Sequence, residues 1–174
     1  MANILTILTF PLPCMAIWRS CDVLFPLDCP LKNSRAKPLA FEIDSSLMPA
    51  CEILLPNMWN ALKPHHESIR HVATLSEPGP FTAQRAGSAF ARGLVHGDDG
   101  WHFFTTSLFN LMPEGIRSDI FLDTGANHWV NSAGKIGTQP LNPEHSVSPK
   151  TCTSDMILTW SQQCAALAVS SSDV

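Results

Sequence analysis

Asp123, Thr124 and Gly125 are the residues whose types and spacing suggest chemistry most directly. They follow the apolar pair Phe121 and Leu122, so the sequence predicts a strand that ends in a tight turn carrying a carboxylate. A carboxylate at such a turn activates a water molecule when a second carboxylate shares its proton. The chain must therefore supply a second acid, from its own sequence or from another copy, together with a cover over the pair.

The segment Leu122-Asp123-Thr124-Gly125-Ala126 resembles the catalytic turn of retroviral-type aspartic proteases. The resemblance implies a hydrolase in which Asp123 activates the attacking water and Thr124 braces the turn. A protease of that type also needs a flap and a second apolar-apolar-Gly segment downstream, and Lys135-Ile136-Gly137 is too close and too polar to serve. We therefore favour a plain hairpin turn and keep the hydrolase as an alternative.

The triplet Gly97-Asp98-Asp99 resembles the metal-binding turn of RNA-dependent RNA polymerases. The resemblance implies a pair of metal ions held on a hairpin. A polymerase palm needs a further Asp-bearing strand upstream and several hundred surrounding residues, so we interpret the triplet as an ordinary turn.

Several histidines lie close enough in sequence to gather a metal ion such as zinc. His96 and His102 flank the expected turn at 99–100, where their side chains could share a face. The spacing H-E-x-x-H does not occur. We therefore expect solvated or core histidines, and we assign no catalytic, cofactor-binding or metal-binding residue. The candidates are His65, His66, Glu67 and His71 in one group, and His96, Asp98 and His102 in the other.

The composition limits the possible partners. Among 174 residues, 15% are charged, against about 25% in typical globular domains. The 11 Lys and Arg residues are scattered, which argues against nucleic acid because phosphate neutralisation needs a basic stripe. The six cysteines form no C-x-x-C pair, so we expect reduced apolar fillers rather than a zinc or redox site.

The N-terminal residues 1–18 are apolar and lack a charged side chain. They could act as a signal peptide that is cleaved after Ala16, in which case the protein would be a small secreted interaction protein. The other interpretation is a buried or edge strand at 3–10. Pro11 and Pro13 interrupt the segment too early for a transmembrane span. Because the positive n-region is weak, we expect a cytoplasmic protein rather than a secreted one.

The rest of the chain divides into a single small α+β region at 19–130, a flexible linker at 131–153 and a C-terminal helix at 154–169. Ile157, Trp160, Cys164 and Ala168 mark one face of that last helix. Within 19–130, the patterns predict a strand at 39–44, a helix at 46–62 that kinks or breaks at Pro56, a helix at 82–92, and hairpins at 94–106 and 119–131.

These patterns predict an α+β fold of short helices and β-hairpins, only partly ordered. Its low charge and many prolines are what an open reading frame of recent origin could give, so we expect a small lineage-restricted, orphan-like protein. We expect it to lack a catalytic site and to act by binding another protein through the apolar segment 46–62. The alternatives are the hydrolase that uses Asp123 and the secreted interaction protein.

Overall fold

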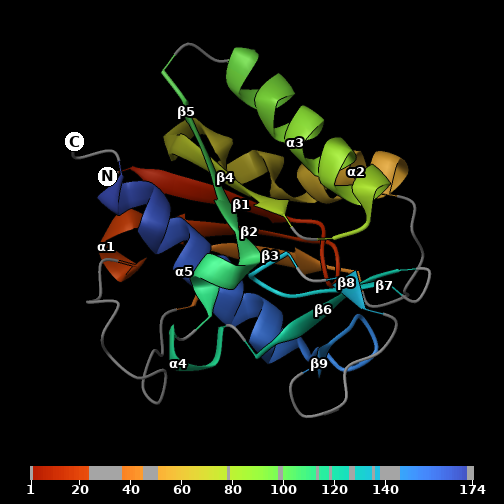
Figure 1. Cartoon of the computed structure of the whole chain (residues 1–174). Helices are drawn as coiled ribbons and strands as arrows, with labels where there is room; N and C mark the ends of the chain where they lie inside the picture. The colour runs from red at the N-terminus through yellow and green to blue at the C-terminus, as the bar shows by residue number, and fades with distance from the viewer. Residues whose placement is uncertain are drawn as a thin grey trace.

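The computed structural model describes residues 2–23, 37–44, 51–77, 79–97, 100–112, 114–117, 119–125, 128–134, 136–137 and 146–171. Its centre is a five-stranded sheet in the order β3-β2-β1-β4-β5 (Figure 1). The strands are β1 (Asn3–Leu8), β2 (Cys14–Arg19), β3 (Ala40–Ile43), β4 (Ile69–Glu77) and β5 (His102–Ser107). Helices pack on both faces of this sheet, and the predicted α+β class is confirmed.

The strand directions bring several chain ends to one edge of the sheet. β2 runs antiparallel to both β1 and β3, whereas β1, β4 and β5 are mutually parallel. The C-terminal ends of β1, β3, β4 and β5 therefore meet at the same edge, which we call the carboxyl edge. In open α/β sheets this is the edge at which ligands usually bind.

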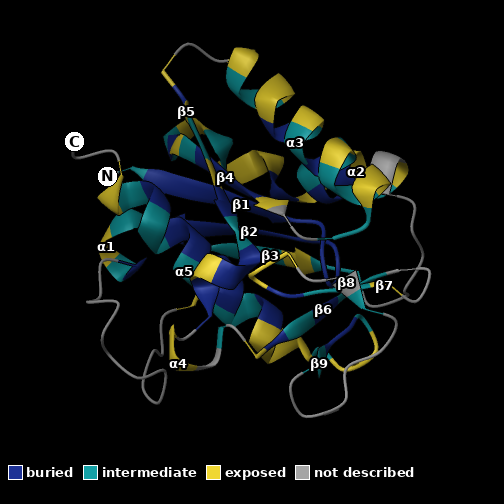
Figure 2. Ribbon diagram, viewed as in Figure 1, coloured by how far each residue is buried: buried dark blue, intermediate teal, exposed yellow. Residues whose placement is uncertain are grey.

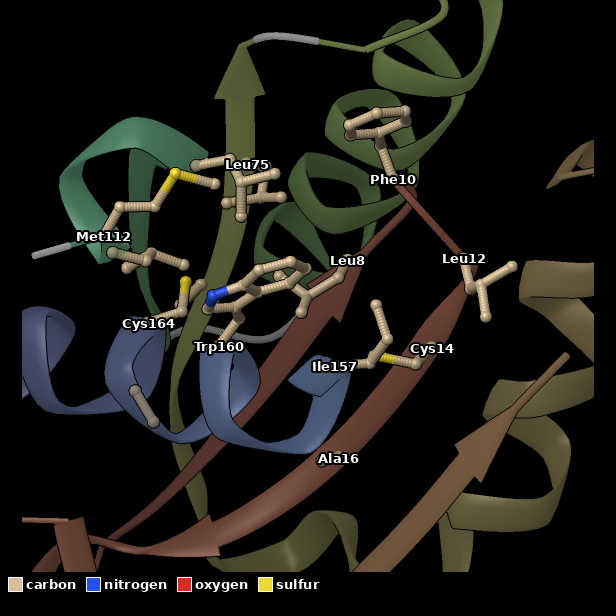
Figure 3. Close-up of a cluster of buried hydrophobic side chains, with 14 of the residues drawn as sticks. Leu8, Phe10, Leu12, Cys14, Ala16, Leu75, Met112, Ile157, Trp160 and Cys164 are labelled. Atoms are coloured by element: carbon tan, nitrogen blue, oxygen red, sulfur yellow. The ribbon is translucent and has the colours of Figure 1, made fainter. Parts of the chain in front are cut away.

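Helices α2 (Cys51–Leu62) and α3 (Phe81–His96) cover one face of the sheet, and α5 (Ser154–Ser170) covers the other (Figure 1). Successive side chains of a strand point to opposite faces, so β1 and β2 feed both layers. Strands covered on both faces are apolar throughout rather than alternating, which explains the N-terminal sequence. The α2/α3 layer buries Leu5, Ile7, Met15, Ile17, Leu55, Met58 and Leu62. The α5 layer buries Ile4, Leu8, Cys14, Ala16, Ile157, Trp160 and Cys164 (Figure 3).

The predicted N-terminal strand is confirmed as β1, and β2 pairs with it. Between them lies the loop 9–13, which is buried and contains a cis bond between Phe10 and Pro11. Ala16 lies inside β2 with no exposed surface. Cleavage after Ala16 stays a prediction, and it would remove β1 together with half of β2.

A second, four-stranded sheet follows in the order β8-β7-β6-β9. Its strands are β6 (Phe121–Gly125), β7 (His128–Val130), β8 (Ile136–Gly137) and β9 (Ser146–Val147). β6 and β7 form the hairpin that was predicted at 119–131. β8 and β9 fall within the predicted linker 131–153, of which residues 138–145 lie outside the described part of the chain.

The helices agree with the sequence patterns in place but not always in length. α2 is one helix that contains Pro56, and residues 46–50 of the predicted 46–62 helix are not described. α5 begins after Thr153, whose side chain accepts from the Met156 amide. α3 continues to His96, so the first strand of the hairpin predicted at 94–106 is wrong. Leu94 and Val95 pack against the α2/α3 core from the helix and prolong its buried stripe.

The shorter elements connect these layers. They are α1 (Ser20–Val23), η1 (Lys63–Ser68), η2 (Leu108–Leu111) and α4 (Glu114–Arg117). Among the described residues, none of the helices combines the length and the apolar character that a membrane span requires. This agrees with the interruption of the N-terminal segment by prolines.

Candidate functional site

Asp123 lies half-buried in β6, opposite Trp129 of β7. The hydroxyl of Thr124 donates to the carbonyl oxygen of His128 at 3.0 Å and so ties the end of β6 to the start of β7. The pairing shifts register between Asp123 and Gly125. This local geometry accounts for the Asp-Thr-Gly segment as part of a hairpin, and the hydrolase alternative stays a prediction.

The histidines are distributed differently from the expected pairs. His71 and His102 occupy paired positions on β4 and β5, and their rings stack with centroids 5.4 Å apart. The hairpin on which His96 and His102 could share a face is not formed, because His96 ends helix α3 rather than a strand. His66 packs edge-on against Trp59. In the part of the chain that the structure describes, which excludes residues 98–99, no three His, Cys, Asp or Glu side chains gather as a metal site would require.

The carboxyl edge is filled by the buried loop 9–13. Phe10 is 1% exposed and packs against Gly79, where an added Cβ would lie 3.0 Å from the Phe10 Cβ. Thr9 packs against Gly87 of α3, where an added Cβ would lie 2.5 Å from the Thr9 Cγ2. Figure 3 shows the Phe10 and Leu12 side chains projecting from this loop. Side chains of the protein therefore occupy the position at which related sheet architectures bind ligands.

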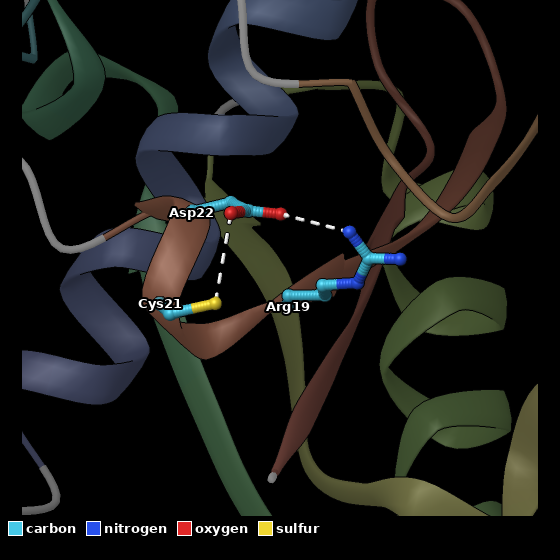
Figure 4. Close-up of polar contacts among 3 residues, drawn as sticks. All are labelled: Arg19, Cys21 and Asp22. Carbon is cyan, nitrogen blue, oxygen red and sulfur yellow. Dashed lines mark hydrogen bonds and ion pairs between the residues drawn. The ribbon is translucent and has the colours of Figure 1, made fainter.

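Two thiols of the α5 layer behave as the apolar fillers that the sequence suggested. Burial raises the pKa of Cys164 to about 12 and raises the pKa of Cys14 still further. Such thiols stay protonated at neutral pH, and the thiolate is the reactive form. Cys21 is exposed, and its thiol donates to Asp22 at 3.6 Å beside the Arg19–Asp22 ion pair of 3.8 Å (Figure 4).

A few large apolar side chains are exposed on the surface and form the candidate binding surface. Among the described residues, the exposed large hydrophobic side chains are Ile53, Phe81 and Met156, and the first two are each 69% exposed. Ile53 lies in the first turn of α2, and Phe81 is the first residue of α3. Both helices begin at the carboxyl edge and lie on the same face of the sheet. We call these two first turns the α2/α3 patch (Figure 2).

Sequence reasoning anticipated only part of this patch. Segment 46–62 was expected to bind a partner, but Leu55, Met58 and Leu62 face the core and Ile53 alone is an exposed large apolar residue of its described part. Phe81 was missed because the predicted helix began at residue 82, whereas the observed helix begins after Pro80. The helical periodicity of α3 could have indicated the exposure of Phe81, since it places Phe81 away from the buried residues of the helix.

Comparison with known proteins finds solved structures of low sequence identity and modest structural similarity. No family model and no curated protein matches the chain. One similar solved structure is described as "an uncharacterized protein with similarity to peptidase YEAZ from Pseudomonas aeruginosa", with 14% identity and a TM-score of 0.48. Another is YeaZ from Pseudomonas aeruginosa, with 15% identity and the same TM-score. The matches cover 78% of this chain but only 62% and 63% of those proteins, and they carry no argument about function.

Proposed function

We propose that the chain is a protein-binding module without a catalytic site, and that it binds its partner through the α2/α3 patch. The observation that carries this proposal is the 69% exposure of both Ile53 and Phe81 on neighbouring helix ends. Burying one such side chain contributes about 1.5–3 kcal/mol. Two anchors alone would give only millimolar affinity, so the surrounding turns must contribute contacts as well.

The location of the patch supports binding over chemistry. The loop 9–13 fills the carboxyl edge from inside, so a partner that reaches this edge meets the outer surfaces of α2 and α3. The apolar face of α2 is already committed to the sheet through Leu55 and Met58. The partner surface therefore comprises the first turns of two helices rather than the whole segment 46–62. The lineage-restricted origin and the cytoplasmic location belong to the same proposal. The origin rests on composition, and the location rests on the weak positive n-region of residues 1–18.

The proposal is tested by photo-crosslinking in the cell that makes the protein. A benzophenone amino acid at position 81 should give a crosslinked protein adduct, and the same group at the exposed position 61 should give much less. Ile53→Asp should abolish the adduct. Asn60→Asp, which adds the same charge to an exposed position of the same helix, should leave it intact.

The urea midpoint of each variant is measured in parallel, so that loss of folding is not mistaken for loss of binding. Equal adducts at positions 61 and 81 would refute the proposal. Equal effects of Ile53→Asp and Asn60→Asp would refute it as well.

A further inference from the structure

Helix α3 presents a line of exposed residues opposite its buried stripe. The residues are spaced by four, four, three and four positions, which places them on one helical face. Gly87 and Ala91 mark the opposite, buried side. Figure 2 shows residues coloured as exposed on the ribbon of this helix. We call the line Phe81, Arg85, Ala89, Arg92 and His96 the outer stripe of α3.

The outer stripe is positively charged in a chain whose net charge is −4. Helix α3 contains two arginines and no Asp or Glu. In the described part of the chain, neither Arg85 nor Arg92 has a carboxylate partner, and the ion pair found there joins Arg19 to Asp22. The two guanidinium groups are therefore available to an anionic partner.

Aromatic rings hold both guanidinium groups in place. The Cζ atom of Arg85 lies 5.1 Å from the ring centroid of Phe81, and that of Arg92 lies 5.0 Å from the ring centroid of Phe103. Such cation–π contacts restrict the side chains before any partner arrives, which lowers the entropy lost on binding. Arg92 follows Arg85 by seven positions, which corresponds to about 10.5 Å along the helix axis.

The surface between the arginines is low enough for close approach. Ala89, the exposed residue of the stripe between the two arginines, carries only a methyl group, and Gly93, which follows Arg92, has no side chain. Helices pack at interaxial distances of about 8–10 Å when the side chains at the contact are small. A second helix can therefore lie along α3 with its side chains between the two guanidinium groups.

We propose that the outer stripe of α3 docks an α-helix of another protein that carries acidic side chains seven residues apart. Carboxylates at that spacing lie about 10.5 Å apart along their own helix and match Arg85 and Arg92, which can bind them in bidentate fashion. Phe81 lies at the end of the stripe and receives an apolar side chain of the same helix. An anionic membrane fits less well, because polybasic membrane segments use about four to eight cations and α3 supplies two arginines. The inference rests on the proposed function and names its partner class.

Synthetic helices test the charge preference. The first probe is a 21-residue peptide with three copies of ELAALEA, the second has three copies of KLAALKA, and the third is the acidic peptide with its central alanine replaced by proline. Titrations of the full-length protein are followed by nitrogen-15 NMR. We expect the acidic helix to bind at least about fivefold more tightly than the other two peptides, with shifts centred on Arg85, Ala89 and Arg92.

A charge-matched pair of variants tests the site. The double variant Arg85→Gln/Arg92→Gln should weaken binding of the acidic peptide about fivefold. Lys37→Gln/Lys150→Gln removes the same charge from exposed positions elsewhere and should change it less than about twofold. Equal binding of the acidic and basic peptides, or equal effects of the two double variants, would overturn the inference. So would binding to vesicles with 30% phosphatidylserine in preference to the acidic peptide. If the adduct at position 81 persists in any of those cases, the proposed function stands and only the acidic-helix inference falls.

Discussion

Replacing Ser161 by alanine tests whether the polar cluster under α5 holds this helix on the sheet. The Ser161 hydroxyl lies 2.6 Å from the Thr6 hydroxyl and accepts from the indole nitrogen of Trp18 at 2.9 Å. All three side chains have no exposed surface. Ser161→Ala leaves the indole N–H buried without this acceptor, whereas the Thr6 hydroxyl can still donate to the Ala16 carbonyl at 3.3 Å.

The cost follows from that single unsatisfied donor. A buried donor that loses its partner costs about 1–3 kcal/mol, and the better helix propensity of alanine returns at most about 0.5 kcal/mol. We expect the free energy of unfolding to fall by about 2 kcal/mol, which lowers Tm by about 4–8 °C for a chain of this length. Ser170→Ala on the same helix is the control, because Ser170 is exposed and donates only to the Leu167 carbonyl.

The assay is urea unfolding followed by tryptophan fluorescence and by circular dichroism. The control should change the free energy of unfolding by less than about 0.5 kcal/mol. Equal stabilities of Ser161→Ala and Ser170→Ala would refute the reasoning, since both gain the same helix propensity and only one loses a buried acceptor. If the reasoning holds, a double-mutant cycle of Ser161→Ala and Trp18→Phe should show a coupling energy of about 1 kcal/mol between Ser161 and Trp18.

Four further measurements test other parts of the fold. Gly87→Ala should lower the free energy of unfolding by about 1–3 kcal/mol, because the added methyl group meets Thr9 in the β1–β2 loop. Gly93→Ala should raise it by up to about 1 kcal/mol, because the added methyl group meets nothing and alanine favours the helix. Urea midpoints of the two variants that move in the same direction would contradict this. The native Cys164 thiol, with its pKa raised from 9.0 to about 12, stays protonated where the unfolded thiol ionises, so its contribution to stability is full below pH 9 and declines as the pH rises toward 12. Thermal melts between pH 8 and 11 measure that decline, and thiol labelling read by mass spectrometry should modify Cys21 long before Cys164. Removal of residues 1–16 should abolish cooperative unfolding because β1 lies at the centre of the sheet, and a truncated chain that still melts sharply would show that the sheet does not depend on β1.

The sequence predicted the elements whose signals are local. The apolar run at 3–10 became β1, and the spacing of Ile157 to Ala168 became the buried face of α5. The hairpin predicted at 119–131 formed as β6 and β7, with Asp123 to Gly125 inside β6 rather than in the turn. The segment 69–77 was not anticipated, although its run Ile69 to Leu75 holds β-branched and apolar residues suited to a strand. β4 pairs in parallel with β1 and β5, and such pairing joins residues far apart in sequence that no short window relates.

The first strand of the hairpin predicted at 94–106 failed for a related reason. Leu94 and Val95 fit either a strand or the end of a helix, and the Asp99-Gly100 pair favoured a hairpin. The sheet topology requires the helix, because β4 and β5 run in the same direction and must be joined by a crossover rather than by a hairpin. Once α3 is that crossover, prolonging it to His96 buries Val95 against the α2/α3 core.

The same crossover decides where the chain can meet a partner. The helix that joins two parallel strands must lie over the sheet, so α3 has one buried side and one side that faces away from the sheet. Its buried side is fixed by Gly87 and Ala91, which leaves Phe81, Arg85 and Arg92 outward at helical spacing. Thr9 and Phe10 fill the carboxyl edge. Substitutions on the exposed side of the α2/α3 layer can therefore change partner binding without disturbing the core. A substitution that alters recognition should therefore fall on this outward side and leave the urea midpoint unchanged.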